Sequence, residues 1–420
     1  MTLTSGIRCL CAVAAAMALL AGCTQPATSS STRNAVTVTT NAAARPAQPT
    51  DSASNAQLGG TEPGALLAAE DFDTVVPRIA ETGAEVTKIR YVSTSGDGSR
   101  TTEVTGTVFV PSGTAPEGGW PVVSYGHGNT GINFDCGPSM YDDLLNQWLP
   151  ITALLLNGYL VVMSDYEGLG AGGVTVAHPF LDSNTLGHNM IDAVRAARNL
   201  TDAAGSRWAA FGGSLGGLAT WAAHDVEPRY GQGLELVGAA AWVPVADVSD
   251  LPAKATAGAL TQDQLHLYFL AIIGLKATSA PDLNLDDYMR GSVAANKDLL
   301  VLCNGPRVPD AIEVLENADP ADMVPASPAA EARMTSLLKE RALGDHMAGA
   351  PLLVMYADQD KLVDQEWTAR VLSEACEAGG SIESELRVGE GHGTIDASRA
   401  FPWIGARFDG QQAANDCPSS

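Results

Sequence analysis

The chain has little positive charge and few aromatic side chains. Its 24 Lys and Arg residues face 48 Asp and Glu residues, and Phe, Trp and Tyr make up 6% of its 420 residues. The resulting net charge of −24 repels phosphate backbones and anionic lipid headgroups, so we expect no nucleic-acid partner and disfavour an acidic substrate. Apolar residues are nonetheless 45% of the chain, which is enough for a large core in one or two domains.

The N-terminal apolar run is too short for an ordinary membrane span. It covers Cys9–Leu20 after a single positive charge at Arg8, and it ends in Leu20-Ala21-Gly22-Cys23. Small residues before a cysteine at this point resemble a bacterial lipobox. We therefore expect a signal peptide over residues 1–22 and a lipid on Cys23. The alternative is an ordinary secretory signal in which the cysteine is incidental.

Aromatic residues are absent from residues 24–60, where Thr, Ser, Ala, Asn, Pro and Gln dominate. Such a segment cannot bury a core. We expect residues 23–60 to be a disordered tether that links the lipid anchor to a folded part.

No C-x-x-C pattern occurs in the chain, so we expect no zinc or redox site. Seven cysteines are present, and three of them fall in the leader or at the lipidation position. The remaining four are Cys136, Cys303, Cys376 and Cys417. An even number in an exported chain predicts two disulfides, and the count alone leaves three connectivities open.

Short apolar runs at regular intervals predict strands, and the runs between them predict helices. The expected strands are 86–93, 103–110, 121–125, 159–164, 208–211, 236–243, 351–356 and 382–388. The later runs are almost continuously apolar, which is typical of parallel strands buried on both faces. The first two alternate in polarity around Ser95-Gly96-Asp97-Gly98 and predict an antiparallel hairpin at the sheet edge.

The interval between Val243 and Pro351 is far longer than one crossover helix requires and predicts an inserted cap. The capping-box pattern Thr261-Gln262-Asp263-Gln264 marks what we expect to be its first helix. The following residues, 265–273, are apolar on nearly every side and must be covered on nearly every side. They form either the core of the cap itself or a lid or wall against an acyl chain.

The most informative stretch is Gly212-Gly213-Ser214-Leu215-Gly216, a G-x-S-x-G pattern between an apolar strand and a helix of small residues. This context is typical of the nucleophile elbow of an α/β-hydrolase. There the backbones approach closely, so the flanking positions need glycine. The serine hydroxyl points upward near a helix N-terminus, which favours a developing negative charge. We therefore predict that Ser214 is the nucleophile.

The two partners of such a serine follow it in the order acid, then histidine. Asp360 lies just after the strand 351–356, three residues beyond a small residue and three before an apolar one, and is our expected acid. Asp358 is the alternative. His392, in the glycine-flanked loop Gly389–Gly393 after the last strand, is the expected base. Asp360 would fix the tautomer of His392, which would take the proton of the nucleophile.

An oxyanion hole needs two hydrogen-bond donors. One should be the backbone N–H of Leu215, the residue directly after the nucleophile. The other should come from the turn 126–131 after the strand 121–125, at Thr130 or Asn129. We expect His127 to shape this turn rather than to act as a second base.

Taken together, these motifs resemble the secretory lipase family of α/β-hydrolases. The resemblance covers roughly residues 85–410 and rests on the turn 125–130, the segments 135–139, 158–162 and 164–168, the elbow, and Gly389–Gly393. It implies ester hydrolysis with Ser214, Asp360 and His392 in the active site, and it places Thr130 at the second oxyanion position. It also implies the disulfides Cys136–Cys303 and Cys376–Cys417. Gly213 departs from the family, which commonly has an aromatic residue there.

The expected fold is an α/β-hydrolase fold, a mostly parallel sheet flanked by helices with an inserted, mainly helical cap. The expected division of the chain is 1–22 signal peptide, 23–60 tether, 61–246 first part of the core, 247–345 cap, 346–410 second part of the core and 411–420 tail.

We interpret the protein as an exported serine esterase or lipase without a cofactor or metal. It would be held at the membrane or cell surface by its anchor, or secreted, and would act on a small-molecule ester or lipid. The alternatives are an acyltransferase or a peptidase or amidase on the same fold, and an inactive surface binding protein. The sequence leaves the oligomeric state open.

Overall fold

The computed structural model describes residues 56–171, 176–344 and 349–418. The expected signal peptide, Cys23 and the tether up to residue 55 lie outside the described residues. The expected boundary between the cap and the second part of the core, at residues 345 and 346, lies outside them as well.

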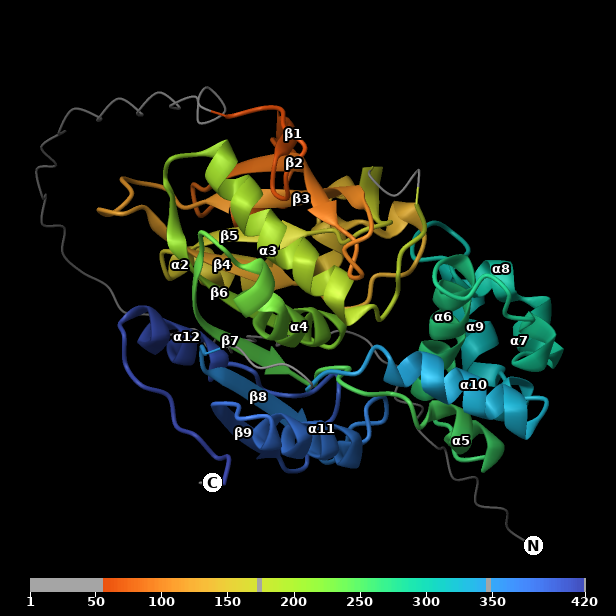
Figure 1. Cartoon of the computed structure of the whole chain (residues 1–420). Coiled ribbons are helices and arrows are strands. Elements are labelled where there is room, and N and C mark those ends of the chain that lie inside the picture. The colour runs from red at the N-terminus through yellow and green to blue at the C-terminus, as the bar shows by residue number, and fades with distance from the viewer. Residues whose placement is uncertain (1–55, 172–175, 345–348, 419–420) are drawn as a thin grey trace, which may run out of the picture. The chain divides into compact units, whose positions relative to one another are not determined.

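A nine-stranded sheet forms the centre of the described chain, in the order β1-β2-β3-β5-β4-β6-β7-β8-β9 (Figure 1). The strands are β1 (Leu66–Asp71), β2 (Glu85–Thr94), β3 (Thr101–Val110), β4 (Trp120–Gly126), β5 (Leu160–Ser164), β6 (Ala204–Gly213), β7 (Glu235–Trp242), β8 (Leu352–Ala357) and β9 (Ile382–Arg387). Strands β1, β2, β3 and β5 pair antiparallel in succession. All pairs from β5 through β4 to β9 are parallel. The sheet is therefore mostly parallel, as the runs of buried residues predict.

The eight predicted strands correspond to β2 through β9, and β2 and β3 form the predicted antiparallel hairpin. The prediction that this hairpin lies at the sheet edge is wrong, because β1 pairs with β2 and takes the edge position. Strand β1 reads Leu-Leu-Ala-Ala-Glu-Asp, with its apolar residues at one end. It lacks the alternation by which a half-buried strand is recognised in a sequence.

The last residues of the expected tether contact the core. The backbone N–H of Gln57 donates to the carbonyl oxygen of Asn199, and Leu58 forms an isolated bridge with Leu66. Ordered backbone bonding therefore begins a few residues before the expected boundary at residue 61.

Helices cover both faces of the sheet. They are α1 (Pro77–Ala80), α2 (Trp148–Leu156), α3 (Ser183–Leu200), α4 (Leu215–Tyr230), α11 (Gln365–Glu377) and α12 (Ala400–Phe408). Short 3-10 turns η2 (Phe134–Cys136), η3 (Pro138–Met140) and η4 (Leu144–Asn146) follow β4. Buried residues of α3, α4 and α11 share one apolar cluster, and those of α1, α2 and α12 share another. Successive residues of a strand enter opposite clusters, as with Val122 and Val123 in β4.

The interval between β7 and β8 is a helical insertion (Figure 1). It contains α5 (Leu251–Thr256), α6 (Gln262–Ala277), η6 (Leu285–Asp287), α7 (Gly291–Ala295), α8 (Lys297–Leu300), α9 (Val308–Asn317), η7 (Pro320–Met323) and α10 (Pro328–Lys339). Thr261 caps α6 in a reciprocal capping box with Gln264, as predicted. The prediction that α6 is the first cap helix is wrong, because the six-residue α5 precedes it. Ten of the sixteen residues of α6 are buried, which agrees with its apolar circumference.

Two disulfides stabilise the described chain, and they are the pairs that the family resemblance implies. Cys136 is joined to Cys303 across 167 sequence positions, and Cys376 is joined to Cys417 across 41. The second bond holds the C-terminal segment beside the edge strand β9, where the N–H of Asp416 donates to the carbonyl of Ile382. Among the described residues, no helix has both the length and the apolar character that crossing a membrane would require.

Candidate active site

Ser214 lies between the central strand β6 and helix α4, at the carboxyl end of the strand. Its backbone has φ 59° and ψ −122°, outside the regions that non-glycine residues normally adopt. Such a conformation persists only where its surroundings hold it. Here the N–H of Ser214 donates to the carbonyl of Trp242 at 3.0 Å, and its own carbonyl accepts from Leu218 and Val245. The residue is therefore held in a strained turn, as the elbow pattern predicts.

Lack of space for a side chain explains two of the glycines in the elbow. A Cβ atom at Gly216 would lie 1.9 Å from the carbonyl oxygen of Gly126, so β4 and α4 meet in a gap that only glycine allows. A Cβ atom at Gly213 would lie 2.0 Å from the indole nitrogen of Trp242 on β7. Trp242 thus occupies space beside the nucleophile on the side where Gly213 lacks a side chain.

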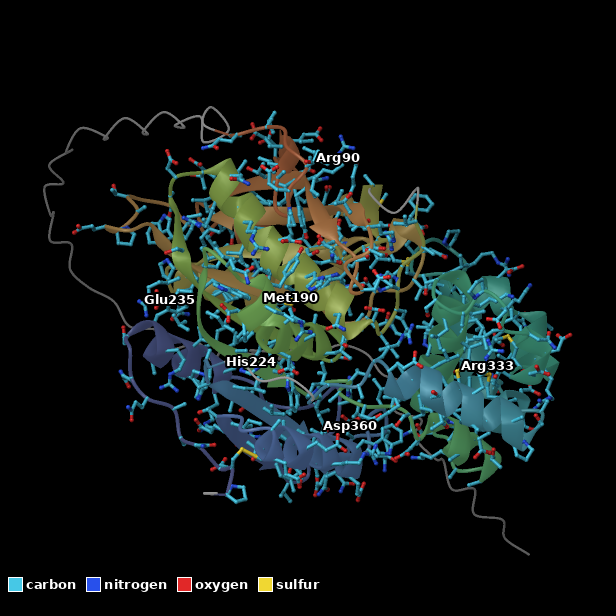
Figure 2. The ribbon with its side chains drawn as sticks, viewed as in Figure 1. Arg90, Met190, His224, Glu235, Arg333 and Asp360 are labelled. Atoms are coloured by element: carbon cyan, nitrogen blue, oxygen red, sulfur yellow. A yellow bond between two sulfur atoms is a disulfide. The ribbon has the colours of Figure 1, made fainter. Side chains whose placement is uncertain are left out.

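His392 and Asp360 lie next to Ser214 although they are far from it in sequence. The Nε2 atom of His392 is 2.8 Å from the Oγ atom of Ser214, and its Nδ1 atom is 2.8 Å from Oδ2 of Asp360. The other carboxylate oxygen of Asp360 accepts from the backbone N–H groups of Leu362 and Val363. Figure 2 labels Asp360 in the C-terminal part of the core, among β8 and α11. A hydrogen-bonded chain of hydroxyl, imidazole and carboxylate results.

The alternative acid, Asp358, has a different environment. Its Oδ1 atom accepts from the N–H of Gly389 at 2.7 Å, and its own N–H donates to the carbonyl of Arg387. Asp358 therefore holds the beginning of the loop that carries His392, and the structure brings Asp360, not Asp358, to the imidazole.

Charged groups fix the remainder of this histidine loop. The guanidinium of Arg387 pairs with Glu390 at 2.8 Å, and the second carboxylate oxygen of Glu390 accepts from the N–H of Asp396 at 2.7 Å. The hydrogen bond from Arg387 lowers the pKa of Glu390, so the pair stays charged. The carbonyl of Glu390 also accepts from the N–H of Gln359, which joins the histidine loop to the loop that carries Asp360.

Of the expected oxyanion donors, Leu215 directly follows the nucleophile, and Asn129 and Thr130 lie in the turn after β4. Leu215 is the first residue of α4, where a backbone N–H has no acceptor within the helix. The carboxamide oxygen of Asn129 accepts from the N–H of Gly131 and so stabilises the turn after β4. The hydroxyl of Thr130 is buried and has no hydrogen-bond partner among the described residues. A Cβ atom at Gly128 would be 3.9 Å from Cβ of Ser214, so the turn passes directly beside the serine.

His127 is buried beneath this turn. Its Nδ1 atom lies 2.7 Å from the carbonyl oxygen of Gly128, and its ring stacks on Tyr166 with centroids 4.4 Å apart. Burial lowers its pKa, so the neutral ring donates from Nδ1 to Gly128. These contacts support the turn, in agreement with the role expected for His127.

Asp165 is a site-supporting residue to which sequence reasoning assigned no role. It is fully buried directly after β5, accepts from the hydroxyl of Thr105 at 2.6 Å and from the N–H of Ser139 at 2.9 Å, and is also bonded by the Ser139 hydroxyl. It thereby fixes the segment that follows the turn after β4. A carboxylate directly after an almost entirely apolar strand was the available signal.

His178 makes stability depend on pH. The residue is buried, its Nδ1 atom lies 2.6 Å from the carbonyl of Glu167, and burial lowers its pKa to about 4. The unfolded chain binds the proton near pH 6.5 and the folded chain does not, so stability falls as pH drops from about 6.5 to 4. The shift in the pKa of His178 can lower the free energy of unfolding by at most about 3 kcal/mol as the pH falls. We expect His178→Asn to remove this contribution. Urea unfolding at pH 7 and pH 4.5 measures it. An unchanged pH slope in the variant would contradict the assignment.

One group of possible metal ligands occurs among the described residues. It consists of Asp135, Cys136 and Cys303. The two sulfur atoms are joined in a disulfide, so neither is a thiolate that could bind a metal.

A hydrogen-bonded serine–histidine–carboxylate chain at the carboxyl edge of such a sheet is typical of the α/β-hydrolase fold. Comparisons of the fold agree. Candida antarctica lipase A in its closed state superposes with a TM-score of 0.67 at 19% identity, covering 85% of both chains. The rice cell wall degrading esterase LipA from Xanthomonas oryzae superposes with a TM-score of 0.65 at 18% identity, covering 84% of this chain and all of the other.

Sequence comparisons point to lipases. The model of the family described as secretory lipase matches residues 145–296. Lipase A of Arthroderma benhamiae is 25% identical over 299 residues, which cover 66% of this chain and 58% of that protein. Lipase 6 of Candida albicans is 25% identical over 356 residues, 74% of this chain and 70% of the relative. The chain thus matches less than two thirds of Lipase A. The chain is therefore similar to secretory lipases over part of its length.

Proposed function

We propose that the protein hydrolyses carboxylic esters through Ser214, His392 and Asp360 and a covalent acyl-enzyme. The proposal rests on the two 2.8 Å contacts that link the hydroxyl, the imidazole and the carboxylate at the end of β6. These distances are within the range required for proton transfer between a nucleophile and its base. Resemblance to lipases and esterases supports the same reaction.

In the first half-reaction, Oγ of Ser214 attacks the ester carbonyl carbon while Nε2 of His392 takes its proton. The carbonyl oxygen becomes an oxyanion, which the N–H of Leu215 and the N–H and hydroxyl of Thr130 stabilise. His392 then protonates the leaving alcohol, and Ser214 remains acylated. Asp360 keeps the proton on Nδ1 and stabilises the imidazolium ion. Removal of one oxyanion donor typically raises the barrier by about 3–4 kcal/mol.

In the second half-reaction, a water molecule takes the position of the alcohol. His392 accepts its proton, and the hydroxide oxygen attacks the acyl carbon. The second tetrahedral intermediate collapses to the carboxylic acid and free Ser214. The ester and one water molecule supply all the atoms of the carboxylic acid and the alcohol. The proposed reaction therefore needs no cofactor.

We further propose that the protein is exported and acts as a lipoprotein anchored through Cys23. The proposal rests on the short apolar leader, the Leu20-Ala21-Gly22-Cys23 sequence and the aromatic-free segment that follows. Two disulfides fit an oxidising compartment outside the cytoplasm. The substrate would be a small-molecule ester or a lipid.

Covalent capture of the nucleophile tests the proposed reaction. We expect a fluorophosphonate probe to react once per chain and to modify the peptide that contains Ser214, because the imidazole of His392 activates that hydroxyl alone. Prior addition of p-nitrophenyl acetate should slow the labelling, and heat-unfolded protein should not react. A folded protein that hydrolyses the ester but carries the adduct on another residue would overturn the assignment.

A further inference from the structure

The Cys136–Cys303 disulfide joins the oxyanion turn to the cap. Cys136 closes η2, shortly after the turn, and Cys303 lies in the cap loop between α8 and α9. A Cβ atom at Gly131 would lie 2.4 Å from Sγ of Cys136 and 2.8 Å from Cβ of Cys303. The bond therefore packs against the residue next to Thr130, the proposed second oxyanion donor.

Hydrogen bonds reinforce the same junction. The side-chain amide of Asn133 donates to the carbonyl of Val301 at 3.1 Å. The side-chain amide of Asn304 donates to the carbonyl and the carboxylate of Asp135 at 3.1 and 3.0 Å. Residues 131–136 and 301–304, which we call the seam, are thus joined covalently and by side chains from both sides.

A cavity of about 320 Å³ adjoins the seam. Asn129, Thr130 and Gly131 form part of one wall, and Val301, Leu302 and Cys303 form part of the other. Further apolar lining comes from the cap residues Leu270, Leu300, Ile312 and Leu315. A volume of this size is typical of sites for small organic ligands, and the aliphatic side chains on its cap side suit a hydrocarbon chain.

The cavity is connected to the proposed chemistry through one short stretch of backbone. A Cβ atom at Gly128 would be in van der Waals contact with Cβ of Ser214, and the next three residues line the cavity. The turn therefore runs from beside Ser214 to the wall of the cavity.

We propose that the Cys136–Cys303 bond is a positioning element of the enzyme: it fixes the width of a cavity that binds the apolar chain of the ester and, through Gly131, the position of the Thr130 donor. The proposal rests on the proposed ester hydrolysis. It predicts that loss of the bond alters both the preference for chain length and the rate for a substrate too short to fill the cavity.

The second disulfide offers a matched control for this test. Cys376–Cys417 ties α11 to the C-terminal segment at the edge strand β9 and does not line the cavity. We expect C136S/C303S to lower kcat/KM for p-nitrophenyl octanoate at least tenfold, through a higher KM, and to lower kcat for p-nitrophenyl acetate severalfold. C376S/C417S should leave both within about twofold. Equal losses in the two double variants would mean that Cys136–Cys303 only stabilises the fold, and unchanged kinetics in C136S/C303S would also overturn the proposal.

A variant that keeps both disulfides tests the cavity itself. Leu302→Trp fills space on the cap wall, so it should lower kcat/KM at least tenfold more for the octanoate than for the acetate. A second series consists of acetate esters of alcohols of increasing length. If Leu302→Trp slows only the long acyl esters, the cavity binds the acyl chain of the substrate. If it slows only the esters of long alcohols, the cavity binds the alcohol chain. Equal loss for acetate and octanoate would reject the cavity as a substrate site. Fluorophosphonate labelling of each variant reports on Ser214 separately, so failure of the proposed reaction is distinguishable.

Discussion

Replacement of Ser214 by alanine is expected to lower kcat for p-nitrophenyl esters about 10⁶-fold. The substitution removes the only atom that forms the covalent bond to the acyl group, and His392 and Asp360 then have no nucleophile to activate. Because the three groups act as a unit, the loss should approach that of removing all three. Stopped-flow or end-point release of p-nitrophenol measures it.

The fold should tolerate this change. Alanine and serine have the same steric limits at φ 59°, and the backbone bonds from Ser214 to Trp242 and from Leu218 and Val245 do not involve the hydroxyl. Near-UV circular dichroism and the thermal midpoint should therefore match those of the unmodified protein. Unchanged ester turnover in a well-folded variant would refute the nucleophile assignment.

The core of the fold could be predicted because its strands carry a strong pattern. Strands β5 and β8 are short, almost entirely apolar and bounded by polar or glycine-containing segments, so they stand out in the sequence. Strand β1 and helix α5 escaped prediction for a physical reason. Both have six residues, and their stability comes from pairing with β2 and from packing in the cap rather than from a periodic pattern of their own.

The candidate site could be predicted only where the order of motifs along the sequence singles out a residue. Ser214 and His392 each lie in a glycine-rich loop directly after a strand. This context leaves one candidate for the nucleophile and one for the base. The acid was ambiguous because Asp358 and Asp360 follow the same strand two positions apart. Only the turn geometry separates them, since Leu362 and Val363 fold back to bind Asp360 while Gly389 binds Asp358. The support from Asp165 and the seam depends on long-range contacts that a local pattern does not encode.

The two aspartates give the sharpest test of the acid, because identical substitutions should have very different effects. Asp360→Asn is expected to lower kcat about 10⁴-fold, since an amide can donate to Nδ1 of His392 and stabilise the wrong tautomer. Asp358→Asn keeps an oxygen that accepts from Gly389, so kcat should change only a few fold. Both are measured with p-nitrophenyl acetate at one pH in the neutral range. Loss of similar size in both variants would mean that the histidine loop, not the carboxylate at Nδ1, determines the rate, and a larger loss in Asp358→Asn would reverse the assignment.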